Sequence, residues 1–142
     1  MKRVFIFSAL TALLYSCETF ERTSDKDCTR QACTMEYRSV SVKFVDTEGK
    51  PVRVKNYTSI NQRTNASMLK GFVPDTVGAN GVVLVASDAN IADVSEVGDS
   101  IIVSGVHPSD AKKSVRAAFF IKGGECACHI TKISGPQEVV VK

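Results

Sequence analysis

Short runs of alternating apolar and polar residues follow one another from about residue 34 onward. Successive side chains of a β-strand point to opposite faces, so such runs predict strands that bury one face and expose the other. The clearest run places Val40, Val42 and Phe44 on one face and three polar residues on the other, which are Ser39, Ser41 and Lys43. Turn residues separate the runs, and the whole pattern is typical of an all-β domain.

Turn signals divide this domain into about seven strands. The segment 46–51 turns the chain, and Val52 and Val54 then begin a second strand. Residues 122–125 indicate a hairpin and residues 134–136 a later turn, whereas residues 56–73 form a weak strand or a long loop. The other predicted strands cover residues 81–87, 100–106, 114–122, 125–133 and 137–142. This spacing predicts an antiparallel two-sheet sandwich over residues 34–142.

A basic start and a short apolar run precede the domain. Lys2 and Arg3 are followed by an apolar stretch over residues 4–15. As a helix this stretch would span roughly 18 Å at ~1.5 Å per residue, which is too short for a bilayer core of about 30 Å. These features predict an export signal that is removed from the mature protein.

The end of this leader resembles the lipobox of bacterial lipoproteins. Leu14 and Ser16 fit the two recognition positions of that pattern, and the thiol of Cys17 would receive the diacylglycerol. Tyr15 departs from the pattern, which prefers a small residue there. The resemblance predicts a lipoprotein signal peptide over residues 1–16 and a lipid anchor at Cys17, where two or three acyl chains would make release from the membrane slow.

A polar tether is predicted over residues 17–33, because this segment offers little to bury. Removal of the leader with Lys2 and Arg3 leaves 16 basic against 15 acidic residues, so the formal charge falls from +3 to about +1. The chain has no block of like charge and no basic stripe with interleaved aromatic residues. Nucleic acid is therefore not expected as a partner.

Five cysteines are an odd number for an exported chain, and assigning Cys17 to the lipid leaves an even set of four. The alternative is a plain secretory signal that leaves Cys17 free or in an intermolecular bridge. Cys126 and Cys128 are expected within a late strand, where a bridge between them would be strained. Two crossed pairings with Cys28 and Cys33 remain open, and either would be a structural disulfide pair in an oxidising compartment.

The same cysteines also allow a metal or thiol-redox site, since Cys28, Cys33, Cys126, Cys128 and His129 offer four thiols and an imidazole. Zinc needs only four ligands, but two cysteines separated by one residue lie closer together than the usual ligand spacing. A catalytic dyad of Cys128 and His129 is disfavoured because neighbours on a strand face opposite sides of the sheet. His129 is expected at the surface or a sheet edge.

Two further groups of polar residues are expected to lie in solvated loops. His107 is followed by Pro108 and Ser109, which indicates a loop residue and not a catalyst. Five residues over 88–99 could suggest a calcium site, but their spacing does not match an EF-hand loop. They are Asp88, Asn90, Asp93, Glu96 and Asp99.

Two segments resemble known families. Residues 42–46 and the Gly-Lys-Pro-Val sequence at 49–52 resemble the opening of carboxypeptidase-regulatory-like or transthyretin-like modules, which implies a small Ig-like or transthyretin-like Greek-key sandwich. Residues 126–136 are similar to the closing segment of short uncharacterised lipoproteins from Bacteroidetes-type bacteria. No catalytic residue belongs to either pattern, so the resemblance implies a fold and a lineage and transfers no activity.

Together these observations predict a lipid-anchored binding or structural accessory module of the cell envelope, facing the periplasm or the surface from the outer membrane. No enzymatic activity and no cofactor are expected. The expected partners are the membrane, through the lipid, and a protein or a glycan. The alternative is a metal-binding or thiol-redox protein that uses the Cys/His cluster.

Overall fold

A computed structural model describes Cys28, residues 32–70 and residues 80–142. The predicted signal peptide, the predicted lipid-attachment residue Cys17 and most of the predicted tether lie outside these residues. Within the described part of the chain, no helix is both long and apolar enough to cross a membrane.

The described residues form seven strands and one short 3-10 helix. In chain order these are β1 (Ser39–Val45), β2 (Lys55–Asn61), β3 (Val82–Ser87), η2 (Asp88–Asp93), β4 (Asp99–Val106), β5 (Ser114–Lys122), β6 (Thr131–Ser134) and β7 (Glu138–Val140).

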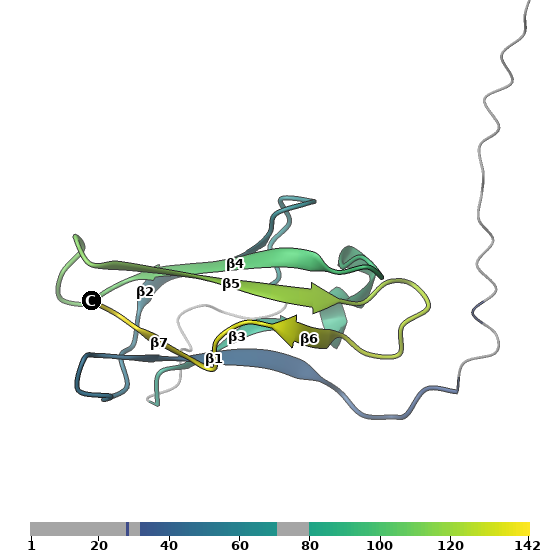
Figure 1. The fold of residues 1–142 in the computed structure, drawn as a ribbon, viewed down its shortest axis with the longest axis horizontal. Coiled ribbons are helices and arrows are strands. Elements are labelled where there is room, and N and C mark those ends of the chain that lie inside the picture. Colours follow the sequence, from purple (N-terminus) through teal and green to yellow (C-terminus); the bar gives the residue numbers. More distant parts are fainter. Residues whose placement is uncertain (1–27, 29–31, 71–79) are drawn as a thin grey trace, which may run out of the picture.

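The strands form two sheets that pack together as a sandwich (Figure 1). One sheet has three strands in the order β3-β1-β7, and the other has four strands in the order β2-β4-β5-β6. The predicted all-β sandwich of about seven strands is confirmed. One pairing departs from the antiparallel pattern, because β7 runs parallel to β1, from Lys43 opposite Glu138 to Val45 opposite Val140. Residues 135–137 carry the chain from β6 to the other sheet without reversing its direction (Figure 1).

Alternate side chains of both sheets meet in one continuous core. Its largest fully buried members come from both sheets and from the connection after β2: Phe44, Met68, Ile101, Phe119 and Ile121. The longer strands β1, β2, β4 and β5 therefore bury one face, as the alternation in the sequence predicted.

Polar side chains also join the two sheets at the edge formed by β3. The Tyr57 hydroxyl donates a hydrogen bond of 2.7 Å to the Leu84 carbonyl, and the Ser59 hydroxyl donates one of 2.6 Å to the Val85 carbonyl. Burial raises the pKa of Tyr57, so its hydroxyl stays protonated and remains a donor. Two carbonyls at the edge of β3 are thus satisfied by side chains of β2 and not by another strand.

The second strand begins later than the sequence predicted. Val52 and Val54 are buried but lie outside β2, and the Val52 N–H donates to the Phe44 carbonyl of β1. Residues from Lys55 onward pair instead with β4 in the other sheet. The chain changes sheets between these positions, so a single ladder cannot continue from Val52.

The same substitution, Ile to Val, should lower the free energy of unfolding more in the core than at the surface. Ile101 is fully buried, whereas Ile133 is 52% exposed. Ile101→Val should lower the free energy of unfolding by about 0.5–1.5 kcal/mol, because it removes a buried methyl group and leaves a cavity. Ile133→Val is the matched control and should change it by less than about 0.5 kcal/mol. Urea unfolding of both variants measures the difference, and equal losses would contradict the assignment of Ile101 to the core.

Candidate functional site

Two disulfides attach the segment before β1 to the loop between β5 and β6. Cys28 is bonded to Cys126 and Cys33 to Cys128, across 98 and 95 residues of sequence. The prediction of structural disulfides is confirmed, and the structure selects one of the two crossed pairings that the sequence left open. All four predicted cysteines therefore meet at one end of the sandwich.

The position of Cys126 and Cys128 differs from the prediction. They lie in the loop between β5 and β6, and the strand predicted over residues 125–133 is only Thr131–Ser134. The Gly123 N–H donates to the Ser95 carbonyl and the Gly124 N–H to the Ile91 carbonyl, so the chain leaves the ladder here and packs on the η2 side. A Cβ at position 123 would come within 2.8 Å of the Ile91 carbonyl oxygen, which explains why this position is glycine.

Asp88 and His129 form the polar centre of this end. The His129 Nδ1 lies 2.7 Å from Asp88 Oδ2, and the His129 Nε2 lies 3.0 Å from the Thr34 hydroxyl. In the neutral imidazole, the Nδ1–H donates to Asp88 and Nε2 accepts from the hydroxyl. Asp88 also accepts hydrogen bonds from the backbone N–H groups of Arg38, at 2.8 Å, and Ile130, at 2.9 Å.

These contacts correct two expectations from the sequence. The side chain of His129 is only 10% exposed, so it is not a surface histidine. Asp88 begins the helix η2 and holds two segments, instead of lying in a solvated loop. Burial alone would raise the pKa of Asp88, but the Arg38 N–H, the His129 ring and the Ile130 N–H together hold this pKa below its ordinary value.

The order carboxylate, imidazole and hydroxyl also occurs in hydrolases, where it activates the hydroxyl beside donors that stabilise an oxyanion. Here the two backbone donors, Arg38 N–H and Ile130 N–H, bind the carboxylate of Asp88. Thr34 directly follows the disulfide-bonded Cys33. The geometry therefore makes this cluster an attachment of the entering segment, added to the two disulfides.

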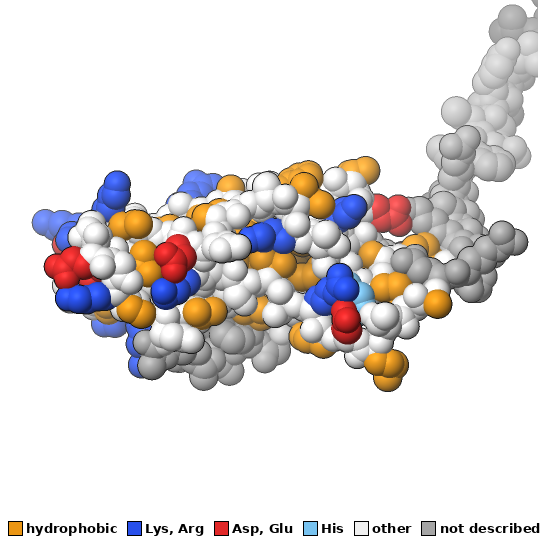
Figure 2. All heavy atoms as spheres, turned by 60° about the horizontal axis from the view of Figure 1, so that its bottom comes forward, with side chains coloured by type: hydrophobic (Ala, Val, Ile, Leu, Met, Phe, Trp, Pro, Cys, Tyr) orange, Lys and Arg blue, Asp and Glu red, His pale blue; other side chains and the backbone are white. Residues whose placement is uncertain are grey.

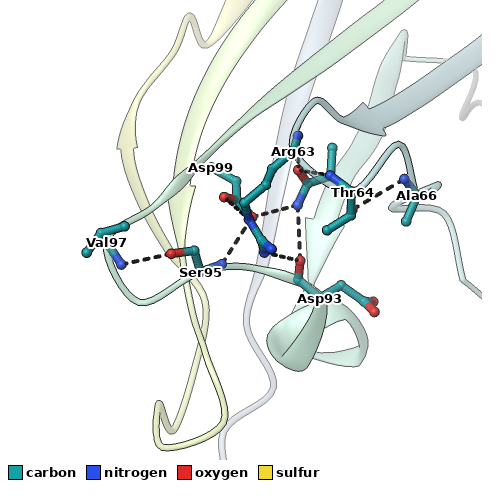
Figure 3. Close-up of polar contacts among 8 residues, drawn as sticks. Arg63, Thr64, Ala66, Asp93, Ser95, Val97 and Asp99 are labelled. Carbon is teal, nitrogen blue, oxygen red and sulfur yellow. Dashed lines mark hydrogen bonds and ion pairs between the residues drawn. The ribbon is translucent and has the colours of Figure 1, made fainter. Parts of the chain in front are cut away.

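A second polar cluster lies at the same end, where β2 finishes and β4 begins (Figure 3). The side chain of Asp99 is 2% exposed. Its carboxylate accepts hydrogen bonds from Arg63 Nε at 2.7 Å and from Arg63 Nη2 at 2.9 Å. Asn61 Nδ2 and the Ser95 N–H donate to the same carboxylate, at 2.7 and 3.1 Å. Asp99 is therefore a buried, fully bonded carboxylate and not part of the solvated acidic loop that the sequence predicted.

The Arg63 guanidinium holds the pKa of Asp99 below its ordinary value, and the Asn61 amide and the Ser95 N–H add to this effect against the cost of burial. Arg63 also donates to the Asp93 carbonyl at 3.2 Å, and the Asp93 carboxylate pairs with Lys70 at 2.6 Å. The cluster fixes the turn after β2 to the segment that enters β4. No pattern in the sequence distinguished Asp99 from its acidic neighbours.

Glu96 lies beside Cys126, Cys128 and His129, whereas His107 is not brought to this site. His107 lies in the loop between β4 and β5, as predicted, with its Nδ1 3.0 Å from the Ser109 hydroxyl. Among the residues that the structure describes, no group of three His, Cys, Asp or Glu side chains is arranged to hold a metal ion. Because disulfide sulfurs are not thiolates, the alternative Cys/His metal site would require reduction of both bonds.

No protein-family model matches the chain, and neither a curated protein nor a solved structure matches it. The resemblances drawn from residues 42–52 and 126–136 therefore stay predictions.

The two depressed carboxyl pKa values predict acid sensitivity. A carboxyl group with a lowered pKa in the folded state stabilises the fold above the ordinary Asp value of about 3.9, and this contribution is lost as the pH falls through the folded-state pKa. Asp99→Asn should cost about 1.5–3 kcal/mol at pH 7, because a hydrogen-bonded carboxylate is lost. The variant should also lose less stability than the wild type between about pH 5 and pH 2.

Urea titrations at each pH test this prediction. Glu125→Gln is the control, because Glu125 is exposed and has no hydrogen-bond or ion-pair partner among the described residues. An Asp99→Asn variant whose stability falls with acid as steeply as that of the wild type would contradict the role assigned to this carboxylate.

The two disulfides close nearly the same loop, so the losses of unfolding free energy on replacing each one should not add up to the loss on replacing both. With one bond intact, the other closes only the short ring formed by residues 28–33 and 126–128, so replacing either pair by serine should cost about 2–3 kcal/mol in the chain-entropy account. Replacing all four cysteines also opens a loop of nearly a hundred residues and should cost about 7 kcal/mol. Denaturant unfolding of the three variants gives these values. Single losses whose sum equals or exceeds the combined loss would contradict this account.

Proposed function

We propose that this chain is an exported lipoprotein, attached to the bacterial outer membrane through a lipid on Cys17, whose sandwich serves as an accessory binding or structural module. The observation that carries the proposal is the pair of disulfides that fastens the last residues of the predicted tether, Cys28 and Cys33, to the sandwich. Disulfides form and persist in oxidising compartments such as the periplasm and the cell surface. They therefore agree with the leader and the lipobox-like sequence at residues 14–17.

The two disulfides and the hydrogen bonds beside them also suit a junction that must withstand force on the tether. Cys28, Cys33, Thr34 and the Arg38 backbone are all fixed to the end of the sandwich that contains His129. A pull on the tether would act on covalent bonds before it acted on the strand ladders. The opposite end of the sandwich, with the loops 46–51 and 107–113, lies away from this junction (Figure 1). In an anchored molecule that end is the one available to a partner.

Lipid attachment is tested by metabolic labelling with an alkyne fatty acid in a bacterial host that processes lipoproteins. The wild-type chain should incorporate the label, fractionate with membranes and start at Cys17. Cys17→Ser removes the acceptor thiol, so it should incorporate no label and fractionate with soluble proteins. Both proteins are assayed for their two disulfides, which should form in each. An unlabelled wild-type chain, or a labelled Cys17→Ser chain, would refute the anchor.

A further inference from the structure

The outer face of the four-stranded sheet has a shallow groove of about 460 Å³. It lies over the start of β5 and the second half of β4, at the end remote from the disulfides, and it continues along β2 to Gln62. The lining side chains that can form hydrogen bonds are Asn56, Thr58, Gln62, Ser104, Ser114 and Arg116.

The ladder register aligns these groups across the strands. Thr58 of β2 lies opposite Ser104 of β4, and Ser104 lies opposite Arg116 of β5. The Thr58 and Ser104 hydroxyls are 2.7 Å apart. Two hydroxyls and a guanidinium thus form one row across the groove.

Arg116 is the only charged residue among the described residues that line the groove. Its side chain is exposed and has no hydrogen-bond or ion-pair partner in the described part of the chain. An unpaired guanidinium offers a planar fork of donors that matches a carboxylate. The groove therefore presents one site for an anion within a lining that combines neutral hydrogen-bonding groups with four aliphatic residues, which are Ile60, Ile102, Val106 and Val115.

The end of the sandwich remote from the disulfides has an excess of positive charge. The described residues 43–55, 106–116 and 138–142 form the end remote from the disulfides and hold eight Lys and Arg against four Asp and Glu. All other described residues hold five against six. Figure 2, which views the molecule from the side of the three-stranded sheet, shows Lys and Arg side chains gathered at this end. Lys55 and Lys113, next to the lining residues in sequence, have no ion-pair partner in the described residues.

We propose that this groove binds an acidic polysaccharide, with a uronate carboxylate on the Arg116 guanidinium and sugar hydroxyls on Thr58, Ser104 and Asn56. The inference deepens the proposed binding role and rests on it, but it does not require the lipid anchor. An excess of positive charge at this end attracts a polyanion and raises its local concentration.

The residues that line the groove favour some classes of partner over others. The cores of protein interfaces are enriched in aromatic residues and methionine, and none of these lines the groove. A neutral glycan would find no aromatic ring to stack on, so the charge must supply much of the affinity. A row of hydroxyl and amide groups that can bind sugar hydroxyls, together with one carboxylate receptor, favours an acidic glycan over an acidic protein segment.

Calorimetric titration of the full protein in non-ionic detergent tests the proposal. The probes are hexamers of galacturonic, guluronic and glucuronic acid, the methyl-esterified galacturonate hexamer, and poly-L-glutamate. At least one uronate hexamer should bind saturably, and its affinity should fall as salt is raised. Esterification, which removes the charge and keeps the sugar, should weaken binding at least tenfold. Arg116→Gln should weaken binding of the uronate by a similar factor.

Arg38→Gln is the matched control, because Arg38 is exposed at the disulfide end and should leave the affinity unchanged. Thermal unfolding of both variants, compared with the wild type, checks that each keeps the fold. No binding of any uronate hexamer, equal binding of the ester, or wild-type affinity in Arg116→Gln would overturn the proposal. Poly-L-glutamate that binds as tightly with the same dependence on Arg116 would also overturn it, in favour of an acidic protein. None of these results depends on the fatty-acid labelling experiment. Calorimetry therefore tests the glycan site independently of the proposed lipid anchor.

Discussion

The structure depends on the burial of alternating side chains between two sheets that pair strands far apart in the sequence. β1 contributes Val42 and Phe44 to this core, and β4 and β5 contribute Ile101 and Phe119 from the opposite layer. Neither sheet could bury its apolar face alone, so the strands acquire stability only when both sheets form. Most contacts of such a sandwich link distant residues, and the cost of bringing those residues together is largely entropic.

Cross-links that act on the unfolded chain offset part of this cost. The disulfides join residues 98 and 95 positions apart, so they reduce the conformational freedom of the unfolded, oxidised chain. Hydrogen bonds then complete the same junction, since Asp88 binds the backbone of the entering segment and the backbone next to His129. Covalent and polar attachments thus converge on one end of the sandwich.

The two ends of the sandwich differ in chemistry. At the disulfide end the acidic side chains of Asp88 and Asp99 are buried and bonded to neighbouring segments. At the other end the basic side chains of Lys55, Lys113 and Arg116 are exposed and unpaired in the described part of the chain. Polar groups that are used up in holding the fold leave little to offer a ligand, whereas unpaired donors around a groove remain available. This difference directs the search for a partner to the end away from the disulfides.

The sequence by itself determined the strand content and the chemistry of the cysteines. Alternation predicted β1 and the full extent of β5, because side-chain direction along a strand is a local property. Cysteine parity and strand geometry reduced the possible pairings to two. Only the tertiary structure decided which pairing forms, that β7 lies parallel to β1, and that His129 is buried against Asp88. These outcomes depend on which loops meet at an end of the sandwich, and residues about 40 to 100 positions apart leave no periodic signal that a single sequence could show.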